Sequence, residues 1–282
     1  MKIIVTGVNG QLGYDVVKEF KSRNYTEVLG IDIQDLDITD KTAVQNFMDI
    51  NKPTVIIHCA AYTAVDKAED NEELCYNVNV IGTKNLIESA KDYNVKFMYI
   101  STDYVFDGNK NGYYEANDLP NPQSIYGKTK YLGEIETIKY KRHFIVRISW
   151  VFGKNGNNFI KTMLRLGNEK DVLNVVSDQI GSPTYTLDLS RLIVDLIETD
   201  KYGVYQATNE GSCSWYEFTK EIFRLTNNRI QVNPILTKDY PTKAKRPMNS
   251  LMSKQNLIDN GFNLLPTWQD ALERYLKEIE VI

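Results

Sequence analysis

Short runs of apolar, β-branched residues alternate with longer amphipathic stretches through the first half of the chain. Continuous apolar runs of this length are typical of strands buried in a parallel sheet. They occur at 2–6, 27–31, 54–58, 96–100 and 143–148. Between them, apolar residues recur every three to four positions, as at 71–93, which predicts helices. This alternation predicts an α/β fold with a doubly wound parallel sheet and right-handed crossovers.

The alternation weakens after Trp150. Helices are predicted at 158–166, 186–199 and 215–225, and short strands at 172–176 and 204–207. We interpret the helix at 186–199 and the strand at 204–207 as a return to the first sheet. The chain is therefore predicted to form a large domain and a smaller α/β lobe. The domain has residues 1–152 and about 185–208, and the lobe has about 153–184 and 209–282.

A glycine-rich turn lies between the first predicted strand and the first predicted helix. Its sequence is Gly7-Val-Asn-Gly10-Gln-Leu-Gly13. Gly7 permits a tight turn, Gly10 lets the backbone approach a pyrophosphate, and Gly13 lets the helix pack close to the strand. The helix N-terminus adds free N–H groups and the positive end of its dipole. The spacing differs from G-x-G-x-x-G, and a purely structural turn is the alternative, but this context predicts a Rossmann-type domain that binds NADH or NADPH.

An acidic residue follows the second predicted strand. Asp32 comes after Gly13 at a distance where a carboxylate can accept both hydroxyls of an adenosine ribose. It would repel a 2′-phosphate, and no Arg or Lys follows before Lys41, so these residues favour NADH over NADPH. The alternative is that Asp32 serves as a turn residue or helix cap. Asp37 and Ile38 are expected to border the adenine.

The candidate acid–base pair is Tyr126 and Lys130. On a helix, a spacing of four residues places both side chains on one face, about one turn apart. The ammonium is then expected to lower the pKa of the phenol from ~10 toward neutrality, which makes a usable general acid or base. Thr102 follows the strand predicted at 96–100, where open sheets place their chemistry, and its hydroxyl is expected to reach the phenol. A surface Tyr and Lys on an amphipathic helix are the alternative.

Two further polar residues have two interpretations each. Asn79 lies inside the helix predicted at 71–93, where it is either solvated or points at the sheet and orders water near Lys130. Arg246 lies in a basic segment and is either a phosphate-binding fork or part of a solvated loop. By contrast, His58 is interpreted as a core histidine, because no metal-type partner is spaced from it.

Composition and charge narrow the classes of function. The 282 residues are 42% hydrophobic and 25% charged, as in globular proteins. A net charge of −4 and a pI of about 5.4 argue against nucleic acid or an anionic membrane as the main partner. Three cysteines without a C-x-x-C motif and only two histidines argue against disulfides, structural zinc and His-dependent triads. Without a signal-peptide pattern or an apolar run near ~20 residues, a cytoplasmic protein is expected.

Several motifs, taken together and in order, resemble the extended short-chain dehydrogenase/reductases and, among them, the dTDP-4-dehydrorhamnose reductase family. The resemblance covers nearly the whole chain. The motifs are Thr6-Gly-Val-Asn-Gly-Gln-Leu-Gly13, Thr63-Ala-Val-Asp-Lys-Ala-Glu69, Ser101-Thr-Asp-Tyr-Val-Phe-Asp-Gly108, Tyr126-Gly-Lys-Thr-Lys130, Ser149-Trp-Val151, Asn157-Asn-Phe159, Asp178-Gln-Ile-Gly-Ser-Pro-Thr184 and Arg246-Pro247.

The resemblance implies a function and roles for individual residues. The implied reaction is NAD(P)H-dependent reduction of the 4-keto group of dTDP-4-dehydro-L-rhamnose, a step in making nucleotide sugars for cell-surface polysaccharide. The implied catalytic residues are Tyr126, Lys130 and Thr102. The residues implied at the cofactor are Gly7, Gly10, Gln11, Leu12, Gly13, Asp32, Asp37, Ile38, Ala61, Tyr62, Thr63, Asn79, Tyr126 and Lys130. Those implied at the sugar nucleotide are Thr102, Asp103, Tyr104, Trp150, Asn158 and Arg246.

The resemblance also raises a metal ion and a partner subunit. Members of the family prefer either NADPH or NADH, and some form homodimers through Mg²⁺ held by acidic side chains. The corresponding position in the first predicted helix is Asp15, one methylene shorter than Glu. No metal ligand is therefore assigned, and a homodimer with Mg²⁺ at its interface is left as an option.

Two other functions share this fold. A nucleotide-sugar dehydratase is expected to carry Asp-Glu after the Thr, whereas Asp103-Tyr104 stands here, and an epimerase is expected to be longer in its C-terminal lobe. A non-catalytic, cofactor-binding regulatory subunit is the second alternative. The presence of Thr102, Tyr126 and Lys130 together argues against that class, since such subunits can lose parts of the catalytic set.

Overall fold

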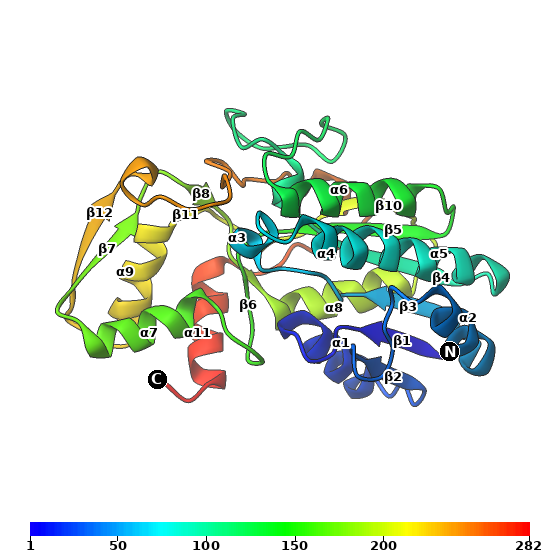
Figure 1. Ribbon diagram of the computed structural model, residues 1–282. Helices are drawn as coiled ribbons and strands as arrows, with labels where there is room; N and C mark the ends of the chain where they lie inside the picture. Colours follow the sequence, from blue (N-terminus) through cyan, green and yellow to red (C-terminus); the bar gives the residue numbers. More distant parts are fainter.

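The computed structural model describes all residues from 1 to 282, and its centre is a six-stranded parallel sheet (Figure 1). The strands lie in the order β10-β5-β4-β3-β1-β2, and every neighbouring pair is parallel. The strands are β1 (Ile3–Thr6), β2 (Val28–Ile31), β3 (Val55–His58), β4 (Lys96–Thr102), β5 (His143–Ile148) and β10 (Gly203–Gln206). The predicted fold class is confirmed. The order of strands reverses at β1 and β3, where a ligand crevice is expected outside the carboxyl ends of the strands.

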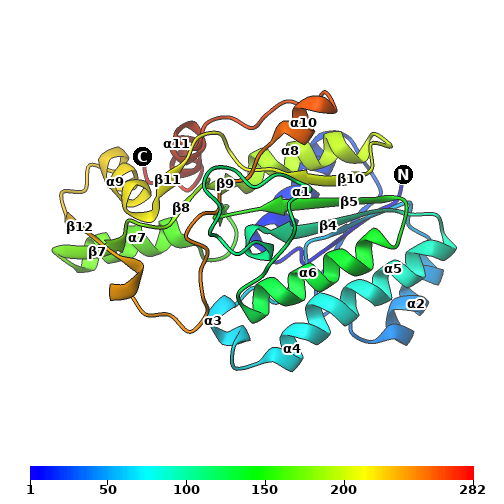
Figure 2. The same cartoon turned by 90° about the horizontal axis from the view of Figure 1, so that it is seen from above.

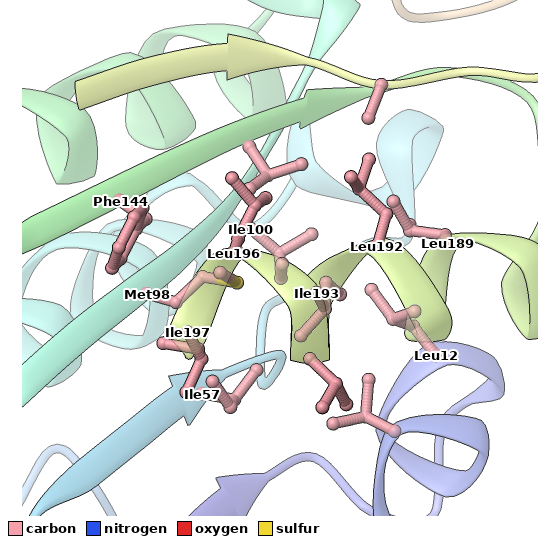
Figure 3. Packing of buried hydrophobic residues seen from close by; sticks show 14 of the residues in the cluster. Leu12, Ile57, Met98, Ile100, Phe144, Leu189, Leu192, Ile193, Leu196 and Ile197 are labelled. Carbon is pink, nitrogen blue, oxygen red and sulfur yellow. The ribbon is translucent and has the colours of Figure 1, made fainter. Parts of the chain in front are cut away.

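Helices cover both faces of this sheet (Figure 2). One face carries α1 (Gln11–Ser22) and α8 (Thr186–Ile197), and the other carries α2 (Lys41–Asn51), α5 (Thr83–Asp92) and α6 (Ile125–Ile138). On the first face, leucines and isoleucines of α8 pack against Met98, Ile100 and Phe144 of the sheet, with Leu12 of α1 beside them (Figure 3). Each Leu or Ile fully buried in this way stabilises the fold by about 1.5–3 kcal/mol.

The single helix predicted at 71–93 contains a wide turn. After the short α3 (Val65–Ala68) and α4 (Glu72–Tyr76), a π-helical segment, η1 (Asn77–Gly82), leads into α5. The i→i+5 bonds of a π-helix accommodate an extra residue, and such segments are frequent at functional sites. One wide turn changes the spacing of apolar residues too little to be visible in the sequence.

A second core lies at the other end of the molecule (Figure 1). It is built from α7 (Phe159–Glu169), α9 (Trp215–Leu225), α11 (Trp268–Glu278) and a parallel pair of strands, β7 (Val172–Val176) and β12 (Gln231–Ile235). A capping box begins α9, in which Ser214 and Glu217 satisfy each other's backbone N–H groups. The strand β12 was not predicted, because Pro234 and the polar residues around it conceal the pattern.

Short elements connect the two cores. β6 (Val151–Phe152) pairs with β9 (Thr184–Tyr185), and β8 (Ile180–Gly181) pairs with β11 (Cys213–Ser214). The remaining elements are η2 (Asp103–Val105), η3 (Thr237–Asp239) and α10 (Gln255–Asp259). Leu257 of α10 belongs to the core under the sheet, so part of the segment at 209–282 packs on the large domain. None of the helices has both the length and the apolar character needed to cross a membrane.

Candidate active site

A cleft of about 740 Å³ lies at the carboxyl ends of β1, β3, β4 and β5, where the strand order predicts a crevice. Most residues implied at the site line it together. They are Gly7, Gly10, Gln11, Leu12, Gly13, Asp32, Asp37, Ile38, Ala61, Tyr62, Thr63, Thr102, Asp103, Tyr104, Tyr126, Lys130 and Trp150. Asn79, Asn158 and Arg246 are not among the lining residues. Residues assigned to the cofactor and residues assigned to the sugar nucleotide therefore line the same cavity, whose size is typical for ligand binding.

The glycine turn has the geometry that a dinucleotide pyrophosphate needs. Gly7 has φ +70°, a left-handed conformation, and a Cβ there would lie 2.7 Å from the backbone N of Ala60. A Cβ at Gly13 would lie 2.3 Å from the carbonyl oxygen of Gly7. Gly10 is the N-cap of α1 and no side chain caps the helix, so N–H groups of its first turn are free to bind an anion.

Asp32 is held at the edge of the cleft by backbone donors. Its carboxylate accepts from the backbone N of Asn9 at 3.0 Å and from the backbone N of Ile33 at 2.8 Å. A carboxylate has about four acceptor positions, so lone pairs remain for ribose hydroxyls. Asp37 is anchored in the same way, because it accepts from the backbone N of Thr39 at 2.9 Å.

The first turn of α6 positions Tyr126 and Lys130. Ser124 is its N-cap and accepts from the backbone N of Gly127 at 3.1 Å, and such caps contribute about 1 kcal/mol. A Cβ at Gly127 would lie 2.2 Å from the carbonyl oxygen of Tyr104. A glycine at this position therefore lets α6 approach η2, and this brings the phenol of Tyr126 beside the end of β4.

The side chain of Lys130 is buried between α6 and the sheet. Its ammonium donates to the carbonyl oxygen of Ile100 at 2.7 Å and lies 4.1 Å from the centroid of the Tyr99 ring. Both contacts stabilise a positive charge. Burial nevertheless lowers the pKa of Lys130 to about 7, while Glu134, one turn further along α6, acts to raise it.

The pKa of the Tyr126 phenol is raised. Burial raises this pKa well above its ordinary value, and a hydrogen bond with the Thr102 hydroxyl only partly opposes the shift. The expectation that Lys130 draws the pKa toward neutrality is therefore wrong in its direction. Desolvation of the phenol is the largest cause of the shift, and the ammonium contacts Ile100 and Tyr99 instead. A phenol that keeps its proton at neutral pH is the form that a general acid needs.

Thr102 connects this phenol to a buried carboxylate. Its hydroxyl donates to Oδ1 of Asp103 at 3.0 Å and accepts from the backbone N of Tyr104 at 3.2 Å. Ser250 donates to the other oxygen of Asp103. The same hydroxyl lies beside the Tyr126 phenol, whose pKa it acts to lower. Burial raises the pKa of Asp103 to about 6, against the effect of both hydroxyl donors.

Asn79 is buried rather than solvated, and the ordering of water near Lys130 stays a prediction. Its Oδ1 accepts from the backbone N of Tyr62 at 2.8 Å, and its Nδ2 donates to Oγ1 of Thr129 at 3.0 Å. Asn79 therefore connects the loop that follows β3, which lines the cleft, to α6. Its place in the π-helical segment η1 turns it toward both partners.

Replacing Asn79 with Ala is expected to weaken binding of the dinucleotide. The variant leaves the N–H of Tyr62 without its partner, and an unmade buried hydrogen bond costs about 1–3 kcal/mol. We expect the Kd of NADPH, measured by fluorescence titration, to rise roughly tenfold. Asn209 is the matched control, because it accepts from the backbone N of Tyr185 at 2.8 Å outside the cleft. Equal Kd values for Asn79→Ala and Asn209→Ala would contradict this role.

Trp150 and Asn158 have different surroundings, although both were assigned to the sugar nucleotide. Trp150 lines the cleft, and its ring stacks on Trp215 with centroids 3.5 Å apart. Asn158 is the N-cap of α7, where it accepts from the backbone N of Lys161 at 3.0 Å. It also donates to Oε1 of Gln11 at 3.1 Å, so it connects the glycine turn to the smaller lobe.

Arg246 reaches the cleft through another residue. Its guanidinium donates to the hydroxyl of Tyr104 at 3.0 Å and to Oδ2 of Asp66 at 2.6 Å. Tyr104 lines the cleft, and burial raises its pKa to about 12. The direct substrate contact assigned to Arg246 stays a prediction.

Ser250, Trp215 and Glu69 were not identified from the sequence. Ser250 contacts a residue 147 positions away, and no local pattern marks it. Trp215 looks like an ordinary core residue at the start of a helix. Glu69 closes a motif that carries the family resemblance, and it accepts from the backbone N of Ile125 at 2.9 Å. Membership of that motif was the only sequence signal for Glu69, whose carboxylate binds the first residue of α6.

Asp15 does not belong to a metal-binding cluster. It is buried in α1, its Oδ2 accepts from the hydroxyl of Thr186, and burial raises its pKa. No group of three or more His, Cys, Asp or Glu side chains in the structure could hold a metal ion. The magnesium expectation therefore finds no support in the arrangement of side chains.

Known proteins with similar sequences and structures point to one family. The family model described as RmlD substrate binding domain matches residues 1–281. A dTDP-4-dehydrorhamnose reductase of Aggregatibacter actinomycetemcomitans is 44% identical, over 96% of this chain and 97% of that protein. Crystal structures of a dTDP-4-dehydrorhamnose reductase from Clostridium acetobutylicum and of one from Bacillus anthracis in complex with NADP superimpose with TM-scores of 0.97 and 0.95. Each is 44% identical and covers 99% of this chain and 100% of its own.

A match from the first residue to the penultimate one, together with a superimposable fold, leaves no part of the architecture unaccounted for. The chain belongs to the RmlD substrate binding domain family.

Proposed function

We propose that this protein reduces the 4-keto group of dTDP-4-dehydro-L-rhamnose to dTDP-L-rhamnose at the expense of NADH or NADPH. The proposal rests on one observation: Tyr126, Thr102 and Lys130 line the same cleft as the glycine turn at 7–13. The names of the similar reductases supply the class of substrate. The acid, its hydrogen-bond partner and a cradle for a dinucleotide are the groups that a carbonyl reduction requires.

The residues of this chain hold and move the proton of the reaction. When bound, NAD(P)H supplies the hydride that reduces C4. Tyr126 donates its phenolic proton to the oxygen of the former carbonyl, and its raised pKa keeps that proton available. Thr102, whose hydroxyl is held by Asp103, lies beside the phenol and orients it toward the substrate. The family resemblance assigns Lys130, one turn from Tyr126 on α6, to the ribose of the nicotinamide.

The two cores divide the ligands between them in this proposal. Residues 1–152 and about 185–208 form the cofactor-binding domain, from which Thr102, Asp103, Tyr104 and Trp150 also reach the sugar nucleotide, and about 153–184 and 209–282 form the substrate-binding lobe. Asp32 favours NADH on charge alone, whereas the similar enzyme from Bacillus anthracis was solved in complex with NADP. Both cofactors therefore belong in the assay. A homodimer follows only from the family resemblance.

The test is the absorbance of the reduced nicotinamide. The purified protein is incubated with NADPH or NADH and with the 4-keto-6-deoxy sugar nucleotide generated in situ from dTDP-glucose and epimerised at C3 and C5. We expect stoichiometric oxidation of the cofactor and one new dTDP-sugar by mass spectrometry. Rearrangement of the sugar without loss of reduced nicotinamide would point to an epimerase. No turnover of any 4-keto sugar nucleotide would favour the regulatory subunit.

The contacts of Tyr104 disfavour a dehydratase. Elimination of water needs an acid–base pair after Thr102, and Tyr104 occupies the position where a Glu is expected. Its hydroxyl accepts from Arg246, and burial raises its pKa to about 12. Tyr104 is therefore a neutral phenol held by Arg246, and it does not supply the second carboxylate of such an acid–base pair.

The kcat/KM for the sugar nucleotide is expected to fall as the pH drops through about 6. Above that value the carboxylate of Asp103 accepts from Thr102 and from Ser250 at once. Below it, Asp103 carries a proton and one of the two donors loses its acceptor. A pH profile of wild type against Asp103→Asn checks this prediction. The variant should be slower and should lack the acidic limb, and an unaltered limb would assign it to another group.

A further inference from the structure

The indole of Trp150 is held in place by residues that lie outside the cleft. Trp150 has φ +49°, a left-handed conformation that is unusual for a bulky residue. Such a backbone persists only where the surroundings over-determine it, and it often occurs at ligand sites. Trp150 immediately precedes β6, at the junction between the two cores (Figure 1). Two contacts fix the direction of the Trp150 side chain.

The first of these contacts is a ring stack with Trp215. The two rings are nearly parallel, with an interplanar angle of 10° and centroids 3.5 Å apart. Trp215 is the first residue of α9 and does not line the cleft. Phe159 of α7 lies against it at 4.5 Å between centroids. Trp215 therefore connects the core of the smaller lobe to a ring that lines the cleft.

A second surface confines the same indole. A Cβ at Gly181 would lie 2.5 Å from Cε2 and 2.8 Å from Cζ2 of Trp150. Gly181 lies in β8, which pairs with β11 just before Trp215. The β8–β11 pair thus places the Trp215 ring and the backbone of Gly181 against the Trp150 indole. The Trp150 indole is therefore confined on two sides.

We propose that Trp215 is a positioning residue for the sugar nucleotide: its ring holds the Trp150 indole in the direction in which it lines the cleft. The proposal rests on the proposed function for the identity of the ligand. Loss of the stack lets Trp150 relax, and the ligand must then restore its orientation at the cost of affinity. The effect is confined to the sugar nucleotide, because the glycine turn and Asp32 lie on other elements.

The first measurement compares wild type, Trp215→Leu and Gly181→Ala. Aromatic stacking of this kind predicts a KM for the sugar nucleotide that is raised roughly threefold to tenfold in Trp215→Leu, with the KM for NADPH unchanged. Gly181→Ala displaces the same indole without altering Trp215, so the same pattern is expected. It also keeps the proposal testable if Trp215→Leu does not fold.

Trp268→Phe is the matched control. Trp268 is a buried tryptophan of the same core that packs on Phe218 at 5.6 Å and does not contact Trp150. It should leave the KM for the sugar nucleotide unchanged even if the protein melts at a lower temperature. If Trp215 has a purely structural role, Trp215→Leu should lower the melting temperature or raise the KM values for NADPH and the sugar nucleotide together. Either result, without a selective rise in the KM for the sugar nucleotide, would overturn the proposal.

Binding of the product separates this proposal from the proposed function. Isothermal titration with dTDP-L-rhamnose in the presence of NADP⁺ needs no turnover. If the wild type binds the product but reduces no 4-keto sugar, the proposed function is refuted. The role of Trp215 is then still tested by the Kd values of the variants. The Kd should rise in Trp215→Leu and in Gly181→Ala but not in Trp268→Phe. An equal Kd in all four proteins would refute the positioning role.

Discussion

Tyr126→Phe is expected to lower kcat by roughly 10²- to 10⁴-fold, the range that a positioned general acid contributes. The phenol is the proton donor in the cleft with a pKa that burial keeps high, and Phe retains its ring without the proton. The affinity for NADPH should stay close to that of wild type, because the edge-to-face contact of the ring with Tyr104 is preserved. Stopped-flow single turnovers with the 4-keto sugar nucleotide measure the chemical step.

Tyr140→Phe is the matched control for this variant. Tyr140 is also a buried phenol, but its hydroxyl donates to the carbonyl oxygen of Val95 at 2.6 Å outside the cleft. Its loss should destabilise the protein without changing the single-turnover rate. Wild-type turnover in Tyr126→Phe would remove the proposed proton donor. A large rate loss in Tyr140→Phe would show that the assay reports stability.

Much of the fold could be predicted because its signals are local. Apolar runs mark strands that are buried on both faces. The glycines at 7, 10 and 13 predict the conformation of the turn from its local sequence alone. The alternation of strands and helices then leaves few topologies. The spacing of Tyr126 and Lys130 predicted their common helix, because a helix converts a sequence interval directly into a face.

The electrostatics of the site could not be predicted in the same way. The sequence places Lys130 near Tyr126, but only the structure shows that both are buried and that the ammonium is bound to the carbonyl of Ile100. Desolvation then decides the sign of the pKa shift at Tyr126. The role of Ser250 could not be predicted either, since its contact with Asp103 joins residues 147 positions apart.

The second large effect is expected in stability, from Arg147→Met. Arg147 of β5 makes a bidentate pair with Glu134 of α6, with Nε to Oε1 at 2.9 Å and Nη2 to Oε2 at 2.7 Å. Both side chains are buried, with exposed fractions of 4% and 0%. The variant leaves the carboxylate of Glu134 buried without a partner, which typically costs about 3–5 kcal/mol. Urea unfolding of the purified protein should show this loss as a lower midpoint.

A surface pair provides the comparison. Arg165 and Glu169 are 2.7 Å apart on α7, but their side chains are 60% and 50% exposed. Water solvates both charges whether or not they meet, so Arg165→Met should move the midpoint little. If the two Arg→Met variants unfolded at the same urea concentration, the burial of the Arg147 pair would have no energetic consequence.

The double variant Glu134→Leu with Arg147→Met distinguishes an unpaired charge from lost packing. If the cost of Arg147→Met is mainly the stranded carboxylate, removing that carboxylate as well should restore much of the stability, and the two single changes should not add. If the cost is mainly lost contacts of the guanidinium with the Phe106 ring and the carbonyl of Ala116, the changes should add. We expect strong non-additivity. The pair would then serve to hold α6, and with it Tyr126 and Lys130, in register with β5, where a one-turn displacement would remove both residues from the cleft.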